Sequence, residues 1–213
     1  MDREAWNQRY ADAELVWSAE ANRFVVQEVS DLPPGRALDL GAGEGRNAIW
    51  LAERGWRVTA VDFSDIGLQK ARRLAEARGV EIDWTEADLR SYSPAPNAFD
   101  LVVLLYIHLP AEERRALVGR AADAVAVGGT LLVVGHDRSN LGEGYGGPQD
   151  PAILFSPDDI TDDLAGIKNL RLVRADRVMR PVMTDDGERH AIDALVRAER
   201  RSSDGDHLRK SAS

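Results

Sequence analysis

Residues 37–45 read ALDLGAGEG, an apolar strand that carries one acid, Asp39, and then opens into a glycine turn. The turn has glycine at alternate positions, namely Gly41, Gly43 and Gly45. Each glycine lets the backbone approach a ligand that a Cβ would exclude. A dinucleotide fingerprint, G-x-G-x-x-G, needs a glycine at position 46, where this chain has Arg46. Because a strand-end carboxylate also repels a pyrophosphate, the turn indicates a ligand that brings a cationic amine to Asp39.

Strand and helix patterns alternate after this turn. Apolar side chains recur at helical spacing in the first segment, and the strands that follow end in further acids, Asp62 and Asp88. The carboxyl ends of parallel strands share one edge of a sheet, so the three acids Asp39, Asp62 and Asp88 form one ordered set. The segments are a helix over 46–55, a strand over 57–64, a helix over 66–79 and a strand within 82–92.

Each acid also has a purely structural interpretation. Asp39 can act as a turn or cap residue, as Asp often does. Asp62 can begin the next helix, although Ser64 and Asp65 already supply cap residues there. Asp88 can likewise be a surface residue. The ordered set favours a ligand site over these separate explanations.

The second half of the chain continues the alternation. The run FDLVVLL has the composition of a buried central strand, and Ser156 before Pro157 has that of a helix start. This pattern predicts an α/β fold with a mostly parallel sheet and helices on both faces. The segments are strands over 99–105 and 130–136, helices over 110–125 and 156–166, and strands over 170–182 and 188–200 joined by the turn 184–187.

With these elements the chain resembles the class I S-adenosylmethionine (SAM)-dependent methyltransferases over residues 6 to about 200. The W-x-x-R-Y segment from Trp6, the GEGRNA turn and the GHD strand end resemble the tellurite-resistance/thiopurine-methyltransferase-like small-molecule branch. The resemblance implies a Rossmann-like sheet of order 3-2-1-4-5-7-6, with the last strand antiparallel. It also implies an N-terminal helical lid over the cofactor.

The implied cofactor is SAM, with S-adenosylhomocysteine as product. In this resemblance Asp39 faces the amine, Asp62 accepts from both ribose hydroxyls, and Asp88 faces the adenine amino group while the next residue offers its backbone N–H. The implied cofactor-binding residues are Trp6, Tyr10, Asp39, Gly41, Ala42, Gly43, Gly45, Asn47, Asp62, Phe63, Asp88, Leu89 and Leu105. No metal-ligand spacing is recognisable, so no metal site is predicted; a metal requirement stays open, because Asp and His near the acceptor could bind Mg²⁺.

The acceptor site is expected where strands 99–105 and 130–136 end, which brings together the candidate catalytic residues His136, His108, Asp137 and Tyr106. An alcohol keeps its proton near neutral pH, so its methylation needs a general base. We expect His136 to be that base, oriented by Asp137 and titrating near pH 6–7, with His108 as second choice. A structural role for either histidine is the alternative.

The predicted activity is methyl transfer to oxygen of a small polar, hydroxyl-bearing metabolite. The loop 138–155 is long and polar, which favours such an acceptor, while the alternative for this loop is a disordered surface segment. The chain lacks the Asn-Pro-Pro-aromatic run typical of methyltransferases that act on nucleic-acid bases and protein amides. An S- or chalcogen-methyltransferase for detoxification, or a non-catalytic SAM-binding regulatory protein, are the alternatives.

Composition restricts the partners. The formal net charge is −9 and no Lys/Arg run precedes the extreme C-terminus, so a nucleic-acid partner is not expected. The 213 residues include no cysteine, and no apolar run approaches the ~20 residues of a membrane span. The N-terminus is too polar for a signal peptide, which predicts a cytoplasmic protein without a membrane partner. The oligomeric state stays open.

Three parts are expected along the chain. Residues 1–35 form the helical lid segment, residues 36–200 the SAM-binding domain, and residues 201–213 a disordered tail in which His207 has no assigned role. The first part holds a large share of the aromatic residues: Trp6, Tyr10, Trp17 and Phe24. Packing of these aromatics onto the core is the alternative to a lid.

Overall fold

The computed structural model describes residues 3–16 and 18–202, so Trp17 and residues 203–213, where the disordered tail was expected, lie outside the described residues. The described helices are α1 (Arg3–Ala11), α2 (Arg23–Val29), α3 (Arg46–Glu53), α4 (Asp65–Arg78), α5 (Ala111–Ala124), α6 (Asn140–Glu143) and α7 (Pro157–Leu164), with a 3-10 turn at Pro151–Ile153. The strands are β1 (Arg36–Leu40), β2 (Arg57–Asp62), β3 (Asp83–Glu86), β4 (Phe99–Leu105), β5 (Val125–His136), β6 (Leu170–Thr184) and β7 (Gly187–Arg200).

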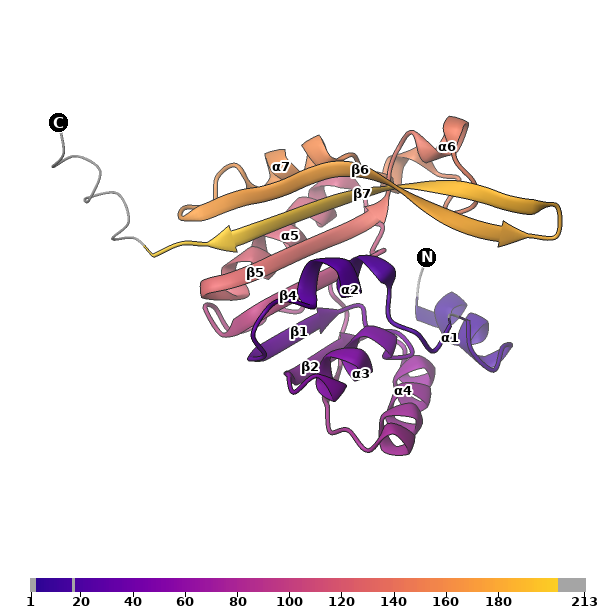
Figure 1. Cartoon of the computed structure of the whole chain (residues 1–213), viewed down its shortest axis with the longest axis horizontal. Helices are drawn as coiled ribbons and strands as arrows, with labels where there is room; N and C mark the ends of the chain where they lie inside the picture. The colour runs from indigo at the N-terminus through magenta and orange to yellow at the C-terminus, as the bar shows by residue number, and fades with distance from the viewer. Residues whose placement is uncertain (1–2, 17, 203–213) are drawn as a thin grey trace, which may run out of the picture.

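The strands form one seven-stranded sheet of order β3-β2-β1-β4-β5-β7-β6, which confirms the predicted order (Figure 1). Neighbours from β3 through β5 pair in parallel, whereas β7 pairs antiparallel with both β5 and β6. The carboxyl ends of β1 to β5 therefore lie along one edge of the sheet, where ligands of open α/β sheets bind. None of the helices among the described residues is long and apolar enough to cross a membrane.

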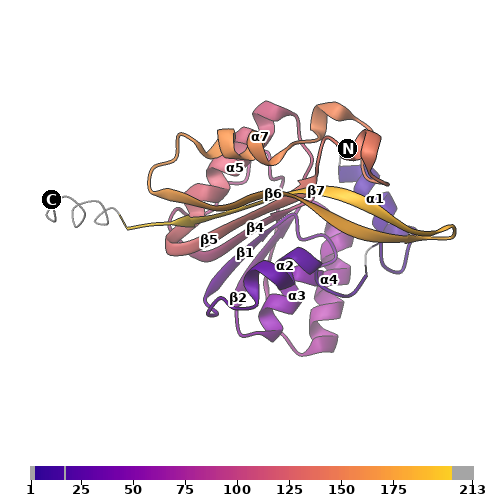
Figure 2. The ribbon, with the colours of Figure 1, turned by 45° about the horizontal axis from the view of Figure 1, so that its top comes forward.

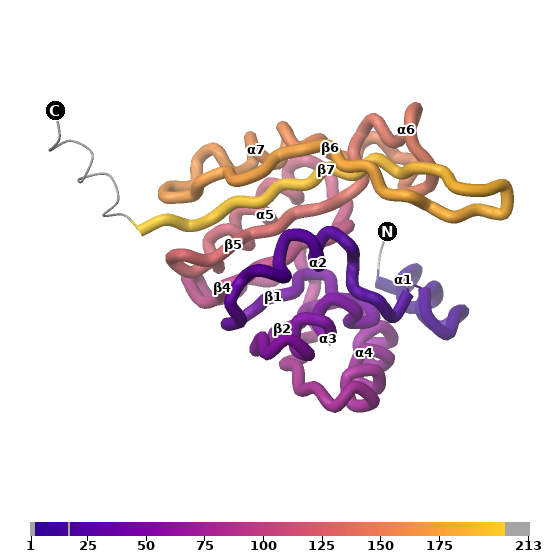
Figure 3. Tube along the Cα trace, viewed as in Figure 1, coloured from indigo at the N-terminus to yellow at the C-terminus, as the bar shows by residue number. Residues whose placement is uncertain are grey.

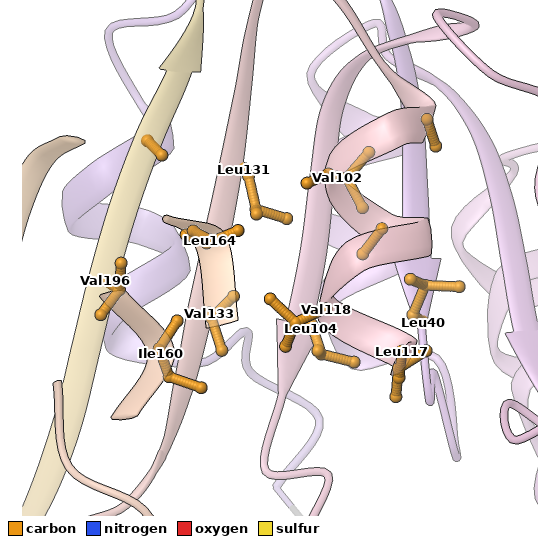
Figure 4. Packing of buried hydrophobic residues seen from close by; sticks show 14 of the residues in the cluster. Leu40, Val102, Leu104, Leu117, Val118, Leu131, Val133, Ile160, Leu164 and Val196 are labelled. Carbon is orange, nitrogen blue, oxygen red and sulfur yellow. The ribbon is translucent and has the colours of Figure 1, made fainter. Parts of the chain in front are cut away.

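Helices cover both faces of the sheet, as predicted: α2, α3 and α4 lie on one face, and α5 and α7 on the other (Figures 1 and 2). Strand side chains alternate between the two faces. Val102 and Leu104 of β4 pack with Leu117 of α5 and Ile160 of α7 (Figure 4). Val103, between them in sequence, packs into the opposite cluster with α2 and α3.

The N-terminal segment divides into two parts with different packing. Helix α2 buries Phe24, Val25 and Val29 in the core on the α3 face, so it belongs to the domain rather than to a lid. Its start is fixed by Asn22, whose side chain accepts from the N–H of Phe24 at 2.9 Å. Of the two helices in this N-terminal segment, α1 is the one that lies at the edge of the sheet formed by the carboxyl ends of the strands (Figure 3). The aromatic Phe24 thus has the packing role, and a lid is confined to α1.

Strands β6 and β7 continue together past the end of β5. The last β5 pair joins His136 to Asp193, but β6 and β7 remain paired from Met179↔Ile192 to Thr184↔Gly187. Residues 179–192 form a two-stranded ribbon that projects at the same end of the molecule as α1 (Figure 3). The expected turn at 184–187 closes this ribbon.

Candidate active site

The glycine turn between β1 and α3 requires glycine at its centre. Gly43 has φ +55°, a left-handed conformation that side-chain-bearing residues rarely adopt. A Cβ on Gly43 would lie 2.5 Å from the hydroxyl oxygen of Tyr10. The N–H of Gly43 donates to Oδ2 of Asp62 at 2.8 Å. This hydrogen bond joins the glycine turn after β1 to the acid at the end of β2. The flanking predicted residues Gly41 and Gly45 also have positive φ, and Ala42 is buried.

Asp39 is a buried carboxyl without a complete set of partners. Its side chain is 1% exposed, and its Oδ2 has no hydrogen-bond partner among the described residues. Burial, followed by the nearby charge of Asp62, raises the pKa of Asp39 to about 7, while Arg46 and the N–H of Ala48 oppose the rise. A cationic group beside Asp39 would favour its charged form. The residues present therefore fit the amine of SAM, as the sequence predicts.

Asp62 sits at the carboxyl end of β2 and already holds backbone groups. Its Oδ1 accepts from the N–H of Ser64 at 2.8 Å, in addition to the Gly43 bond on Oδ2. Burial raises its pKa, and these hydrogen bonds oppose the rise. The backbone of Phe63 also hydrogen-bonds the Asp62 carboxylate. Because a carboxylate has about four lone-pair sites, acceptor capacity remains for a ribose hydroxyl. Phe63, the next predicted residue, is half-buried.

Asp62→Ala is expected to weaken SAM binding by roughly 1.5–3 kcal/mol, because the ribose hydroxyls would lose a charged acceptor. Calorimetry with SAM and S-adenosylhomocysteine measures the effect. Asp62→Asn keeps one acceptor oxygen and should lose less. Asp83→Ala, at the exposed start of β3, is the control that should bind as the parent does. If Asp62→Ala binds SAM as tightly as the parent does, Asp62 does not hold the ribose of SAM.

The third predicted acid, Asp88, lies two residues beyond β3 and is engaged with a neighbour. Its Oδ2 is 2.6 Å from Nη2 of Arg90, and hydrogen bonds from Arg90 hold the pKa of Asp88 below its usual range. Leu89 is buried in the core. The contact with adenine stays a prediction, and Asp88 would have to share its carboxylate with Arg90 to make it.

Helix α1 closes over the glycine turn. The rings of Trp6 and Tyr10 lie on one face of α1 with centroids 5.4 Å apart. Tyr10 is 4% exposed and packs against Gly43 and Gly67, where added Cβ atoms would meet its ring or hydroxyl. Tyr10 is therefore placed at the turn, and Trp6 lies against Tyr10.

A charged pair between half-buried Lys70 and buried Glu44 connects the end of α1 to the same turn. Lys70 of α4 donates to the backbone carbonyls of Tyr10 and Ala13 and lies 3.3 Å from Oε1 of Glu44. The Glu44 carboxylate also accepts from the N–H of Val16. Because Glu44 is part of the glycine turn, movement of α1 and movement of the turn are mechanically linked.

Removal of residues 1–20 is expected to raise the dissociation constant for SAM and to slow methyl transfer, because α1 would no longer exclude water from the turn. Secondary structure should persist, since α2 starts at Arg23 and packs in the core. Tyr10→Ala should reproduce part of the loss and Tyr10→Phe much less. Calorimetry and circular dichroism separate binding from folding. If the shortened chain binds SAM as tightly as the parent does, the aromatic residues of α1 have only a packing role.

Two further predicted cofactor residues have structural partners in this arrangement. Oδ1 of Asn47 accepts from the backbone N–H of Asn22 at 2.8 Å and so positions the approach to α2. Leu105, the last residue of β4, is buried between the sheet and its α3-face helices. Their contacts with the cofactor remain predictions.

The acceptor end of the site brings the predicted histidines together. His108 follows β4 and His136 ends β5, and both are half-buried. Nε2 of His108 lies 3.2 Å from the backbone N of His136 and 3.3 Å from its Nδ1. The ring of Tyr106 meets that of His136 edge-on, with centroids 5.1 Å apart.

Both imidazoles are neutral at physiological pH. Burial, and then the positive charge of Arg180, lowers the pKa of His136 to about 4. Burial, and then His136, lowers the pKa of His108 to about 3. The expected titration near pH 6–7 is therefore wrong for this environment. Burial also raises the pKa of Tyr106, so its phenol stays protonated.

Asp137 does not orient His136, contrary to the expectation from their adjacency. Its Oδ1 accepts from the N–H and hydroxyl of Ser139 at 2.8 and 2.7 Å and lies 3.1 Å from Nε of Arg177. Successive strand residues point to opposite faces, so the side chains of residues 136 and 137 diverge. Asp137 thus fixes the start of the loop after β5.

Two residues that the sequence analysis missed complete this region. Asp193 of β7 accepts from the Tyr106 hydroxyl at 2.9 Å and from Nε of Arg180 at 2.9 Å. The Arg180 guanidinium carbon lies 5.7 Å from the centroid of the Tyr106 ring. Asp193 is an isolated acid in the apolar run AIDALV, which was an available signal, whereas nothing in the sequence distinguishes Arg180 from its neighbouring arginines.

A third missed residue, Arg46, links the two ends of the site. It directly follows the glycine turn as the first residue of α3, and its guanidinium lies within electrostatic reach of Asp39, Tyr106 and Arg180. Burial lowers the pKa of Arg46, and the positive charge of Arg180 adds to this effect, whereas Tyr106 and Asp39 oppose it. Arg46 thus brings a positive charge to the region of Asp39 and Tyr106.

The loop after β5 is folded against the ribbon and covers His136. Asn140, buried at the start of α6, donates to the carbonyl of Gly146 at 2.9 Å and accepts from the N–H of Ile192 at 2.7 Å. A Cβ on Gly147 would lie 2.8 Å from Nε2 of His136. The same added Cβ would lie 2.5 Å from Cδ2 and 2.9 Å from Cγ of His136, so the loop backbone lies against the ring of His136 around Cδ2.

The proteins to which this chain is similar include methyltransferases. Residues 37–129 match the family model described as a methyltransferase domain. A demethylmenaquinone methyltransferase of Thermus thermophilus is 34% identical over 57% of this chain and 54% of its own length. A 2-heptyl-1-hydroxyquinolin-4(1H)-one methyltransferase of Mycobacteroides abscessus is 27% identical over 54% of this chain and 52% of its own length. The chain thus spans about half the length of these relatives.

Two solved structures share the whole architecture. One, from work on conversion of a disulfide bond into a thioacetal group during echinomycin biosynthesis, has TM-score 0.73 and 22% identity, covering 98% of both chains. TehB from Haemophilus influenzae has TM-score 0.70 and 18% identity, covering 94% of this chain and 67% of its own. At such identity these similarities concern the fold. Residues 37–129 therefore match the methyltransferase-domain family model, and the seven-stranded sheet has the strand order of the class I SAM-dependent methyltransferase fold.

Proposed function

We propose that this protein transfers a methyl group from SAM to the oxygen of a small polar molecule that carries an acidic hydroxyl. The observation that carries the proposal is the pair of neutral imidazoles, His108 and His136, at the ends of β4 and β5. They lie along the same sheet edge as the glycine turn and the acids of β1 and β2. A base is thus available beside the expected cofactor site.

The cofactor end is assigned to the turn and its acids. Asp39 would hold the amine and Asp62 the ribose, while Gly43 leaves room for backbone contact and α1 closes over them. Arg46 adds a cation suited to the carboxylate of the methionine portion. When bound, SAM supplies an electrophilic methyl group on a sulfonium. The protein's main task is then to align the acceptor oxygen and to take its proton.

The acceptor class follows from the strength of the base. A general base works best when its pKa is near the operating pH, and His136 has a pKa of about 4. Such a weakly basic imidazole takes a proton more easily from an acidic hydroxyl, such as that of an N-hydroxy heteroaromatic, an enol or an acidic phenol, than from an aliphatic alcohol. The relative named for a 1-hydroxyquinolin-4(1H)-one supports a small hydroxyl-bearing acceptor. The positive charge of Arg180 beside the Tyr106 ring also suits a polar or anionic acceptor.

The same low pKa supports a second candidate, methyl transfer to a thiol or another chalcogen. A thiol has a pKa of about 8.5 and loses its proton without strong base assistance. A site whose imidazoles are weak bases therefore also suits a soft nucleophile. The architecture shared with TehB agrees with this candidate at the level of the fold.

A methyl-transfer assay with the full chain separates the candidates. SAM is supplied with phenols, N-hydroxy heteroaromatics, thiols and aliphatic alcohols, and S-adenosylhomocysteine formation is measured by mass spectrometry. We expect turnover with the acidic hydroxyl compounds and little with aliphatic alcohols. Turnover with thiols alone would favour the second candidate. Tight SAM binding without turnover, also against extracts of cellular metabolites, would contradict both and favour a non-catalytic role.

A further inference from the structure

The contacts of His108 determine the protonation state of its own ring. The backbone N–H of His136 is a fixed donor, and it points at Nε2 of His108 from 3.2 Å. Nε2 of His108 must therefore carry a lone pair. The His108 ring also hydrogen-bonds the backbone of Tyr106, which stabilises its protonated form and so identifies the carbonyl as acceptor. This leaves Nδ1 of His108 as the protonated nitrogen.

The same lone pair then sets the protonation state of His136. Nδ1 of His136 lies 3.3 Å from Nε2 of His108. Two lone pairs would repel each other at this distance, so the contact is favourable only when Nδ1 of His136 carries the hydrogen. In a neutral ring the other nitrogen, Nε2, is then the acceptor. Nε2 is the ring nitrogen that is not in contact with His108, and Gly147 of the covering loop lies against the neighbouring Cδ2.

We propose that His108 is the positioning residue of the base: through Nε2 it holds His136 as the Nδ1–H tautomer and turns the basic Nε2 of His136 toward the acceptor. The proposal rests on the proposed function, in which His136 is the general base that takes the proton of the acceptor hydroxyl. It gives His108 the role that the sequence analysis assigned to Asp137, whose carboxylate is engaged with Ser139 and Arg177. A carboxylate orients the catalytic histidine in the serine-protease triad; here a second imidazole has that place.

The proton balance of the transfer follows from this tautomer. The acceptor's O–H bond breaks as its oxygen bonds to the methyl carbon, and the methyl–sulfur bond breaks with its electron pair left on sulfur. The released proton binds to Nε2 of His136. The ring is then an imidazolium whose Nδ1–H still donates to His108, so this hydrogen bond strengthens as the charge develops. The proton then passes from Nε2 to solvent, which restores the neutral ring.

Side-chain ¹⁵N NMR of the full chain tests the tautomer without any activity. The chain has four histidines, so spectra of the parent, His136→Ala and His108→Leu assign the two rings. At pH 7 we expect Nδ1 of His136 to have the shift of a protonated nitrogen and Nε2 that of an unprotonated one. A parent protein in which His136 carries its hydrogen on Nε2 would overturn the proposal, whatever the protein methylates.

Variants of His108 test the consequence for the rate. Glutamine can place an amide oxygen near the position of Nε2, so His108→Gln should keep the His136 tautomer and most of kcat. His108→Leu should release the tautomer and lower kcat at least about tenfold with little change in the acceptor KM; loss of tautomer control in the serine-protease triad costs up to ~10⁴. His190→Leu, on the exposed ribbon, is the matched control.

The outcomes separate the two proposals. Equal tautomer and kcat in His108→Leu and the parent would overturn the positioning role while leaving the proposed activity intact. The expected tautomer in a protein that methylates no hydroxyl would contradict the proposed function instead. Because the parent spectrum and His108→Gln need no disruptive change, the test does not depend on whether His108→Leu folds.

Discussion

Gly43→Val is expected to abolish detectable SAM binding while the domain remains folded. Gly43 has φ +55°, and a Cβ there would lie 2.5 Å from the Tyr10 hydroxyl. A left-handed conformation costs an L-residue roughly 1–2 kcal/mol, and a β-branched side chain more. The new side chain would also occupy the space in which backbone should meet the cofactor. Calorimetry with SAM measures the loss, and circular dichroism the fold.

Gly128→Val is the matched control for backbone strain. Gly128 has φ +84°, and an added Cβ would have no atom within 4 Å. It lies near the amino end of β5, at the opposite edge from His136. The two variants therefore share the conformational cost but differ in their distance from the turn. Normal SAM binding by a folded Gly43→Val protein would show that the turn does not hold the cofactor.

The cofactor end of the site was predictable because its residues are close in sequence. Asp39 and Gly43 belong to one continuous strand and turn, and Asp62 ends the next strand in the expected order. Strand periodicity and glycine spacing are local properties, so they predicted the edge of the sheet where these groups meet, whereas the sheet order was implied by the resemblance to class I methyltransferases. The hydrogen bond between Gly43 and Asp62 confirms their proximity.

The acceptor end was only partly predictable because it depends on contacts distant in sequence. His108 and His136 were expected at neighbouring strand ends, but their hydrogen bond could not be inferred from that placement. Asp137 was assigned to its neighbour in sequence, whereas its partner Arg177 comes from β6. Arg180 likewise reaches the site through the ribbon. Antiparallel register across the ribbon decides these contacts, and periodicity does not specify register beyond the two faces.

In the N-terminal segment, too, the local features could be predicted from the sequence and the contacts distant in sequence could not. Trp6 and Tyr10 were expected on one face of a helix, and their rings do meet. The prediction did not divide the segment between α1 at the site and α2 in the core. That division follows from Asn22, which caps α2 and is held by Asn47 of α3. The pairing is between residues of two separate helical regions and has no local signature.

His136→Ala is expected to lower the rate of methyl transfer to an acidic hydroxyl by about 10²–10⁴-fold, the usual contribution of a general base. SAM affinity should stay close to that of the parent, because the assigned cofactor residues lie on other strands. Initial rates with saturating SAM, together with calorimetry, separate the two effects. His190→Ala, on the exposed ribbon, should leave both unchanged. Full activity of His136→Ala toward a thiol alone would support the second candidate.

The pH dependence follows from the lowered pKa of His136. Only the neutral ring accepts a proton, and burial together with Arg180 keeps it neutral down to about pH 4. The parent rate should therefore be level from pH 8 to 5 and fall through a midpoint near 4, provided that acceptor ionisation is held constant. The unfolded chain binds this proton near pH 6.5, so the contribution to stability is present above that pH and is lost as pH falls toward 4. Circular dichroism at each pH must confirm the fold, and a midpoint at 6–7 in folded protein would contradict a buried His136 as the base.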